Sequence, residues 1–175
     1  MDFNLIERLQ KENQLVKLKE ANDYAKRYGL SLSEKDMELI LSERKEALKT
    51  QKRIEFGEGI VSKIIYEFCD SSFIDQSNYA DTIMRLQDIF YMYKNEMLDE
   101  ITDDELLHFM REQFETVCSG DLDYLEGTCL DIFAQAIRAG YGGCGESDGY
   151  GEFKKFDIVT RWDHELYLEA LSNLF

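Results

Sequence analysis

Apolar residues recur at helical spacing along most of the chain, and the clearest run lies in its middle. Between residues 78 and 98 they stand three and four positions apart: Ile83, Leu86, Phe90, Tyr93 and Met97. The other side of the same segment is also largely apolar, through Met84, Ile89, Tyr91 and Met92. Because a helix that is apolar around most of its circumference needs neighbours on several sides, we expect a central, buried helix here.

Two helices are predicted ahead of this central one. The first extends from Phe3 as far as the stop signal Gly29, and its second half is more clearly amphipathic than its first. The second begins at Ser33, which forms a capping box with Asp36. Its inner stripe is thin and consists of Met37, Ile40, Arg44 and Leu48. We expect residues 1–56 to form a charged helical hairpin, either packed on the rest of the chain or projecting from it.

Three more amphipathic segments complete the pattern. Residues 60–70 carry two adjacent apolar rows, which are Ile60, Val61, Ile64, Ile65 and Phe68. Thr102 and Glu105 form a second capping box and start a helix with the buried stripe Leu106, Met110, Phe114 and Val117. Asp121 or Asp123 caps a third helix whose apolar positions follow heptad spacing: Leu122, Leu125, Cys129, Ile132, Ala136 and Ala139. Each stripe predicts a helix face that is buried in the core.

The last part of the chain changes character. Residues 140–151 hold six of the eleven glycines and predict one long irregular loop. Residues 152–160 are expected to form either a short β element or an extended packing segment, and Asp163 caps a terminal helix after it. The pattern as a whole predicts an all-α multi-helix bundle. We expect a helical core domain over residues 57–175, which either stands apart from the hairpin or forms one continuous domain with it.

Composition and charge narrow the range of partners. The chain contains no proline, the residue that most often interrupts helices, and its formal net charge is −16. Residues 57–153 hold 21 acids against 5 bases, whereas residues 1–56 hold 11 acids and 12 bases. The acidic residues of the segment 57–153 repel a phosphate backbone, so we expect no nucleic-acid binding. No apolar run could cross a bilayer and no signal sequence is evident, so we expect a cytoplasmic protein without membrane association.

The four cysteines lie far apart in the sequence, at Cys69, Cys118, Cys129 and Cys144, and none belongs to a CxxC pair. In a chain without an export signal, this spacing indicates reduced thiols rather than a disulfide framework. We expect most of them to be buried as small apolar side chains.

Five segments of the chain resemble those of one protein family: IEFGEGI, IIYEFCDS, NYADTIMRLQDIFYMYKNE, DDELLHFMREQFE and GDLDYLEGTCL. The likeness spans about residues 54–138 and is to an uncharacterised bacterial family, a domain of unknown function. The resemblance implies that these segments belong to one inherited domain. It implies no activity, substrate or fold, and it assigns no functional residue.

Three residues on one predicted helix are candidate metal ligands. Glu105, His108 and Glu112 follow one another at one-turn spacing, and Glu-x-x-His pairs of this kind hold metals in di-iron bundles. A di-iron site needs a second such pair, but the only other histidine, His164, has no glutamate at the required spacing. The alternative is an exposed helix face beside the apolar stripe.

The glycine-rich loop contains a second candidate, because a flexible backbone there would expose the Cys144 thiol. His164 and Asp163 follow 20 residues later and could complete a Cys-His nucleophile pair. Glu146 and Asp148, however, place negative charge beside the sulfur, which disfavours the thiolate. A surface loop without catalytic function is the favoured interpretation.

No catalytic template is matched in full, so the sequence favours a non-enzymatic, intracellular helical module that binds a protein partner or a second copy of itself. No cofactor is expected. The hairpin of residues 1–56 is the expected contact surface, because its thin stripe needs something outside the hairpin to cover it. The alternative is a metal-dependent or small-molecule enzyme, with a site between the helix at 102–118 and the segment 140–164.

Overall fold

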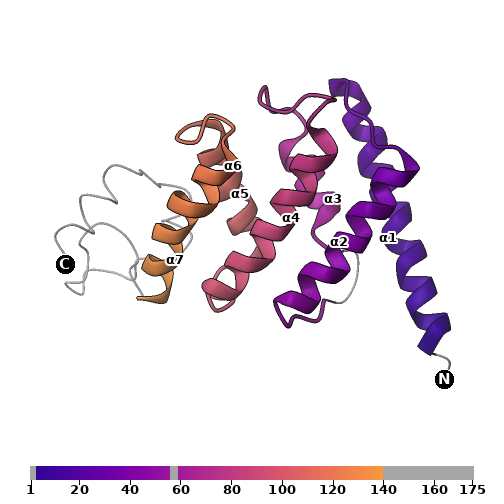
Figure 1. The fold of residues 1–175 in the computed structure, drawn as a ribbon, viewed down its shortest axis with the longest axis horizontal. Helices are drawn as coiled ribbons and strands as arrows, with labels where there is room; N and C mark the ends of the chain where they lie inside the picture. The colour runs from indigo at the N-terminus through magenta and orange to yellow at the C-terminus, as the bar shows by residue number, and fades with distance from the viewer. Residues whose placement is uncertain (1–2, 56–58, 140–175) are drawn as a thin grey trace. The chain divides into compact units, whose positions relative to one another are not determined.

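The structure, a computed structural model, describes residues 3–55 and 59–139, and within these ranges it contains helices and no strand (Figure 1). The all-α class expected from the sequence is confirmed. The loop at 140–151 and the β element expected near 152–160 lie outside the described residues. The chain divides between Met92 and Tyr93 into two compact units. Whether residues 1–56 form a domain separate from the helical core domain of residues 57–175 is not tested by this division, and both domains stay a prediction.

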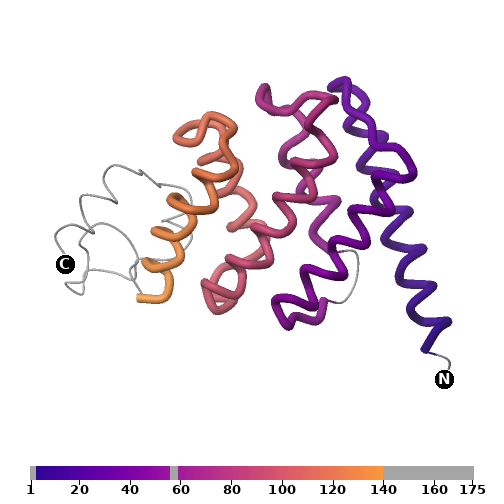
Figure 2. The backbone as a smooth tube through the Cα atoms, viewed as in Figure 1, coloured from indigo at the N-terminus to yellow at the C-terminus, as the bar shows by residue number. Residues whose placement is uncertain are grey.

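The first unit begins with two helices that run in opposite directions (Figure 2). Helix α1 spans Phe3–Ala25 and continues as a 3-10 turn, Lys26–Tyr28, which ends at Gly29 in the left-handed conformation (φ 79°). Helix α2 spans Glu34–Thr50 and starts with the predicted capping box. The connection is held by the buried side chain of Asn22. Its amide donates to the Leu32 carbonyl at 3.1 Å and accepts from the Leu32 N–H at 2.7 Å.

The core of the first unit forms where the second half of α1 packs against α3, which spans Val61–Phe68. All five apolar residues expected on this short helix are buried, as are the inner residues of α1: Leu18, Ala21 and Ala25. Helix α4 spans Tyr79–Glu96, and its predicted stripe is buried along its whole length. On the other side of this helix, Ile89 and Tyr91 are buried, whereas Met84 and Met92 are only partly buried.

The second unit contains the end of α4 and three later helical segments. Helix α5 spans Asp103–Glu115 and starts with the predicted capping box of Thr102 and Glu105. The expected continuation of its stripe to Val117 is wrong, because the helix ends at Glu115 and Val117 is 38% exposed. The backbone turns at Ser119 and Gly120, both at positive φ, and this turn buries Cys118 instead.

The last helix within the described residues contains a wider turn that the heptad pattern did not predict. Helix α6 spans Leu122–Tyr124 and is capped by Asp121, Leu125–Leu130 forms a π-helical segment, and α7 spans Asp131–Arg138. A π turn takes up one residue more than an α turn, so every later side chain rotates away from the heptad register. Leu122 and Ile132 are only partly buried and Ala139 is exposed, so these three predicted core positions are wrong, whereas Leu125, Cys129 and Ala136 are buried as predicted. Phe133 and Ile137, which the heptad pattern did not place in the core, are buried as well.

Polar contacts tie the end of α4 to the rest of the second unit. The Tyr93 hydroxyl lies within hydrogen-bonding distance of the Glu126 carbonyl, in the π-helical segment, and of Asp131 Oδ1 at 2.8 Å. Arg138 donates to Glu96 Oε2 at 2.6 Å. Because a π turn leaves carbonyls without their α-helical partners, the Tyr93 hydroxyl supplies a substitute at this position.

Candidate functional site

The predicted metal ligands share one side of α5 but make different contacts. Glu105 is engaged in the capping box, where its Oε2 accepts the Thr102 N–H at 2.8 Å. His108 is exposed, and Glu112 is partly exposed. Among the residues that the structure describes, no three His, Cys, Asp or Glu side chains are grouped closely enough to hold a metal ion. The sequence spacing of Glu105, His108 and Glu112 is therefore the only observation that favours a metal site there.

The candidate nucleophile pair, Cys144 and His164 with Asp163, lies outside the described residues. The same holds for the segment 140–164, which would form one side of the alternative enzyme site. The other three cysteines, Cys69, Cys118 and Cys129, are buried free thiols, as expected.

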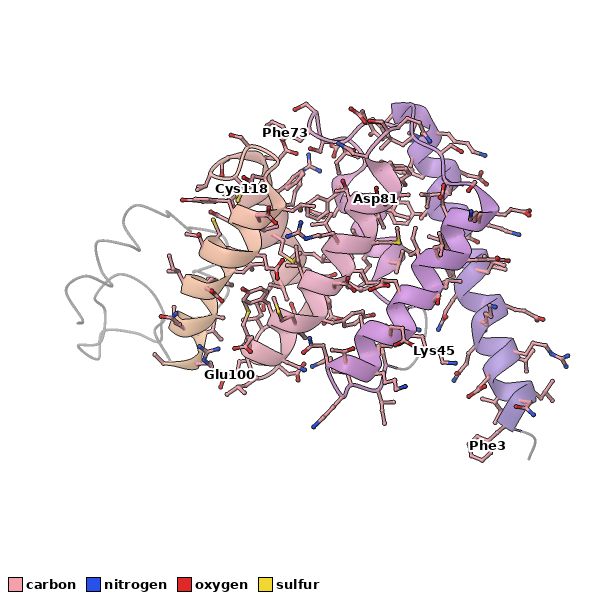
Figure 3. The ribbon with its side chains drawn as sticks, in the orientation of Figure 1. Phe3, Lys45, Phe73, Asp81, Glu100 and Cys118 are labelled. Carbon is pink, nitrogen blue, oxygen red and sulfur yellow. The ribbon has the colours of Figure 1, made fainter. Side chains whose placement is uncertain are left out.

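Two of these buried thiols are neighbours. The Sγ atoms of Cys118 and Cys129 are 3.6 Å apart, close enough for one thiol to donate a hydrogen bond to the other sulfur. Cys118 lies in the turn after α5, where Figure 3 labels it, and Cys129 lies in the π-helical segment. Sequence analysis placed Cys129 in the core but did not pair it, since the two residues are 11 positions apart and match no spacing motif.

The hydrogen bond between the two thiols also separates their acidities. Donation toward Cys129, followed by burial, raises the pKa of the Cys118 thiol above its usual range. The same bond stabilises a negative charge on the Cys129 sulfur and lowers the pKa of that thiol. Because the two thiols interact through this hydrogen bond, their titrations are coupled, and the apparent pKa values belong to the pair.

A buried charged cluster lies in the first unit, around the Glu55 carboxylate. Its Oε1 accepts from Arg44 Nη2 at 2.6 Å, from Arg44 Nε at 3.1 Å and from the Tyr91 hydroxyl at 2.6 Å. Arg44 and Tyr91 are both buried. This cluster explains why an arginine occupies the inner stripe of α2, since its charge is paired there. These hydrogen bonds hold residue 55 against α2 and α4.

The first half of α1 presents apolar side chains to solvent. None of residues 3–16 is buried, although six of them are large and apolar. Four of these six are exposed: Phe3 at 81% exposure, Leu5 at 43%, Leu9 at 51% and Val16 at 53%. Figure 3 places Phe3 at the N-terminal end of this helix. At about 100° per residue, Leu5, Leu9 and Val16 fall on one side of α1, opposite the buried Leu18, Ala21 and Ala25. We call Leu5, Leu9 and Val16 the outer row.

Charge distinguishes the same segment from residues 57–153, which carry 21 acids against 5 bases. Residues 3–16 contain two acids, Glu7 and Glu12, and two bases, Arg8 and Lys11. Their net charge is zero, so the net charge of −16 is carried entirely by the other residues. Within the described residues, no helix is both long enough and apolar enough to span a membrane.

Comparison with known proteins extends the resemblance seen in the sequence. No curated protein and no solved structure gives a significant match. The model of a family of unknown function, DUF6323, matches residues 17–143. This match contains the five segments that carry the resemblance and extends beyond them in both directions. The matched region includes the Glu55 cluster and the pair of thiols and begins directly after the outer row. The chain belongs to this family of unknown function, DUF6323.

Proposed function

We propose that this protein is a non-enzymatic, cytoplasmic interaction module that associates with a second copy of itself through the outer row of α1. The observation that carries the proposal is the exposure of Leu5, Leu9 and Val16 on the side of α1 that faces away from its own core. An exposed apolar row on a helix is a common basis of helix pairing between chains.

Helix stability supports a contact at this place. Residues 3–16 make up more than half of α1, yet none of them is buried in the fold. A helical segment of this length is marginal in water without packing against an apolar face. Burying each leucine or valine of the outer row would contribute about 1.5 to 3 kcal/mol. A second copy supplies that apolar face, because it carries the same row.

Charge supports a second copy as the occupant of the row. Two chains of net charge −16 repel each other, and the repulsion is weakest where their contacting segments are neutral. Residues 3–16 are such a segment, with Glu7 and Glu12 balanced by Arg8 and Lys11. Acids and bases on both helices can then pair across the contact, whereas an acidic partner or a nucleic acid would gain nothing from a neutral surface.

The test is the mass of the full chain in solution as a function of concentration, measured by sedimentation equilibrium. The wild-type chain should approach twice its monomer mass of 20.5 kDa. The variant Leu9→Glu should weaken association at least tenfold, because it places a charge in the centre of the apolar row.

The matched control is Gln10→Glu, which adds the same charge at the neighbouring exposed position. This variant should associate within about twofold of the wild type, since a charge at the edge of a contact changes affinity little. A wild-type chain that stays monomeric across the concentration range would exclude self-association. Equal weakening by both variants would show that charge, and not the outer row, governs it.

A further inference from the structure

The thiol pair of the second unit is independent of the outer row, and it has the geometry of a reactive site. The Cys118 and Cys129 sulfurs are 3.6 Å apart, whereas a disulfide bond is about 2.05 Å long. A shift of about 1.5 Å, shared between two side chains by rotation about their Cα–Cβ bonds, would close this gap.

The backbone on both sides of the pair has an unusual conformation. Cys118 precedes Ser119 and Gly120, which turn at φ 48° and 84°. Cys129 lies in the π-helical segment Leu125–Leu130. Short π segments within α-helices occur frequently at functional sites. Here Cys129 keeps the core position that the heptad pattern predicts, and its sulfur lies against that of Cys118 in the turn.

Access limits the kind of reagent that can reach the pair. Cys129 is 0% exposed and Cys118 is 6% exposed, at the edge of a turn whose neighbouring residue Val117 is 38% exposed. A large disulfide such as oxidised glutathione would have to open the turn before it could react. Hydrogen peroxide is close to water in size and needs a much smaller opening.

We propose that Cys118 and Cys129 form a redox-active dithiol site, which a small peroxide converts to an intramolecular disulfide. One sulfur attacks a peroxide oxygen, the O–O bond breaks, and the departing hydroxide takes up the thiol proton as water. The product is a sulfenic acid. The second sulfur then attacks the first, the S–O bond breaks, and a second water leaves. Two thiols and one hydrogen peroxide thus yield one disulfide and two waters, and the peroxide receives the two electrons.

The proximity of the second thiol decides which product forms. An isolated sulfenic acid persists until a thiol converts it to a disulfide or more peroxide over-oxidises it to a sulfinic acid. Here the second sulfur is already within van der Waals distance, so the disulfide forms first. A reductant with two thiols, such as dithiothreitol, restores both cysteines.

The sequence allows a direct test on the full chain. No lysine or arginine lies between Arg111 and Arg138, so trypsin releases both cysteines in one peptide, residues 112–138. The folded chain is treated with graded hydrogen peroxide, denatured, alkylated with iodoacetamide and digested. After oxidation, this peptide should lack two hydrogen atoms and carry no alkyl group. After dithiothreitol, it should carry two alkyl groups.

Free-thiol titration gives the second readout. The reduced chain has four cysteines, and formation of the disulfide should lower the number of free thiols by two. Cys69→Ser is the matched control, because it removes another buried thiol and should leave disulfide formation intact. Cys118→Ser and Cys129→Ser should each abolish the disulfide form of the peptide, and circular dichroism establishes that these variants are folded.

Two results would overturn the proposal. In the first, both cysteines of peptide 112–138 are still alkylated, and hence still reduced, after peroxide treatment that oxidises a dithiol model peptide. The other is a peptide that gains oxygen atoms as sulfinic acid without passing through the disulfide form. Either result would show that the two sulfurs, although adjacent, do not react with each other.

Discussion

The guanidinium of Arg44 and the carboxylate of Glu55 form an ion pair whose N···O distance is 2.6 Å, with only 8% and 21% of their side chains exposed. The two residues are separated by the end of α2 and by the connection that leads to α3. The Tyr91 hydroxyl donates to the same carboxylate oxygen at 2.6 Å. A segment without regular structure is thus held to two helices through one side chain.

Replacement of Gly59 by alanine should disrupt this ion pair. A Cβ at residue 59 would lie 2.5 Å from Arg44 Nε and 2.8 Å from Glu55 Oε1, and both atoms are held by their hydrogen bonds. The backbone there is also left-handed, with φ 77°. We expect Gly59→Ala to lower the free energy of unfolding by about 2 to 4 kcal/mol, measured by urea denaturation.

Gly29 provides the matched control, because it has nearly the same φ, 79°, and a Cβ there meets no atom within 4 Å. Gly29→Ala should therefore cost only the backbone strain, about 1 to 2 kcal/mol. Equal losses for the two variants would show that the contact with Arg44 and Glu55 contributes nothing beyond that strain.

The Tyr91 phenol should make stability fall at alkaline pH. Burial, followed by the nearby Glu55 carboxylate, raises the pKa of Tyr91 above its usual range. A group whose pKa is raised by folding contributes stability that is complete below the unfolded pKa, about 10 for tyrosine, and is lost as the pH rises toward the folded pKa. The free energy of unfolding should therefore decline above about pH 10.

Tyr91→Phe should make this decline shallower by about 1.4 kcal/mol per pH unit, the contribution of one proton. A remaining slope is expected, since burial also raises the pKa of Tyr79 and Tyr93. Urea titrations at several pH values between neutral and strongly alkaline would measure both slopes. Parallel curves for the variant and the wild type would contradict the assignment.

Two neighbouring residues of α7 test the register set by the π-helical segment. The Phe133 ring is buried and stacks on Phe109 with the ring centroids 3.8 Å apart, whereas Ile132 is only partly buried. Phe133→Ala should lower the free energy of unfolding by about 3 to 5 kcal/mol, and Ile132→Ala by about 1 kcal/mol. Urea denaturation of both variants measures these losses. A larger loss for Ile132→Ala than for Phe133→Ala would favour the heptad register that the sequence predicted.

The ends of the helices were the features best predicted from the sequence, because each depends on residues that are close together in the chain. The capping boxes at Ser33 and Thr102 and the stop at Gly29 need only a hydroxyl, a carboxylate three residues later, or a backbone free to adopt positive φ. Buried stripes such as that of α4 were predictable for a similar reason, since apolar spacing identifies one helix face.

The candidate sites were harder to predict, because their members are distant in sequence. Glu105 and His108 were found through their one-turn spacing, which detects neighbours on one helix only. Cys118 and Cys129 meet across a turn and a π-helical segment, and Arg44 and Tyr91 both bind the Glu55 carboxylate. No local spacing signals contacts of this kind.

The amino-acid sequence by itself determined that this protein is helical and acidic, where several helices begin, and which residues supply most of its core. These properties follow from local hydrogen bonding, side-chain polarity and a period of about 3.6 residues. Only the tertiary structure decided which apolar residues of α1 stay in solvent, which thiols meet, and where α7 leaves the heptad register. Such contacts depend on how whole helices end and pack, and a single inserted π turn is enough to exchange the buried residue for its neighbour.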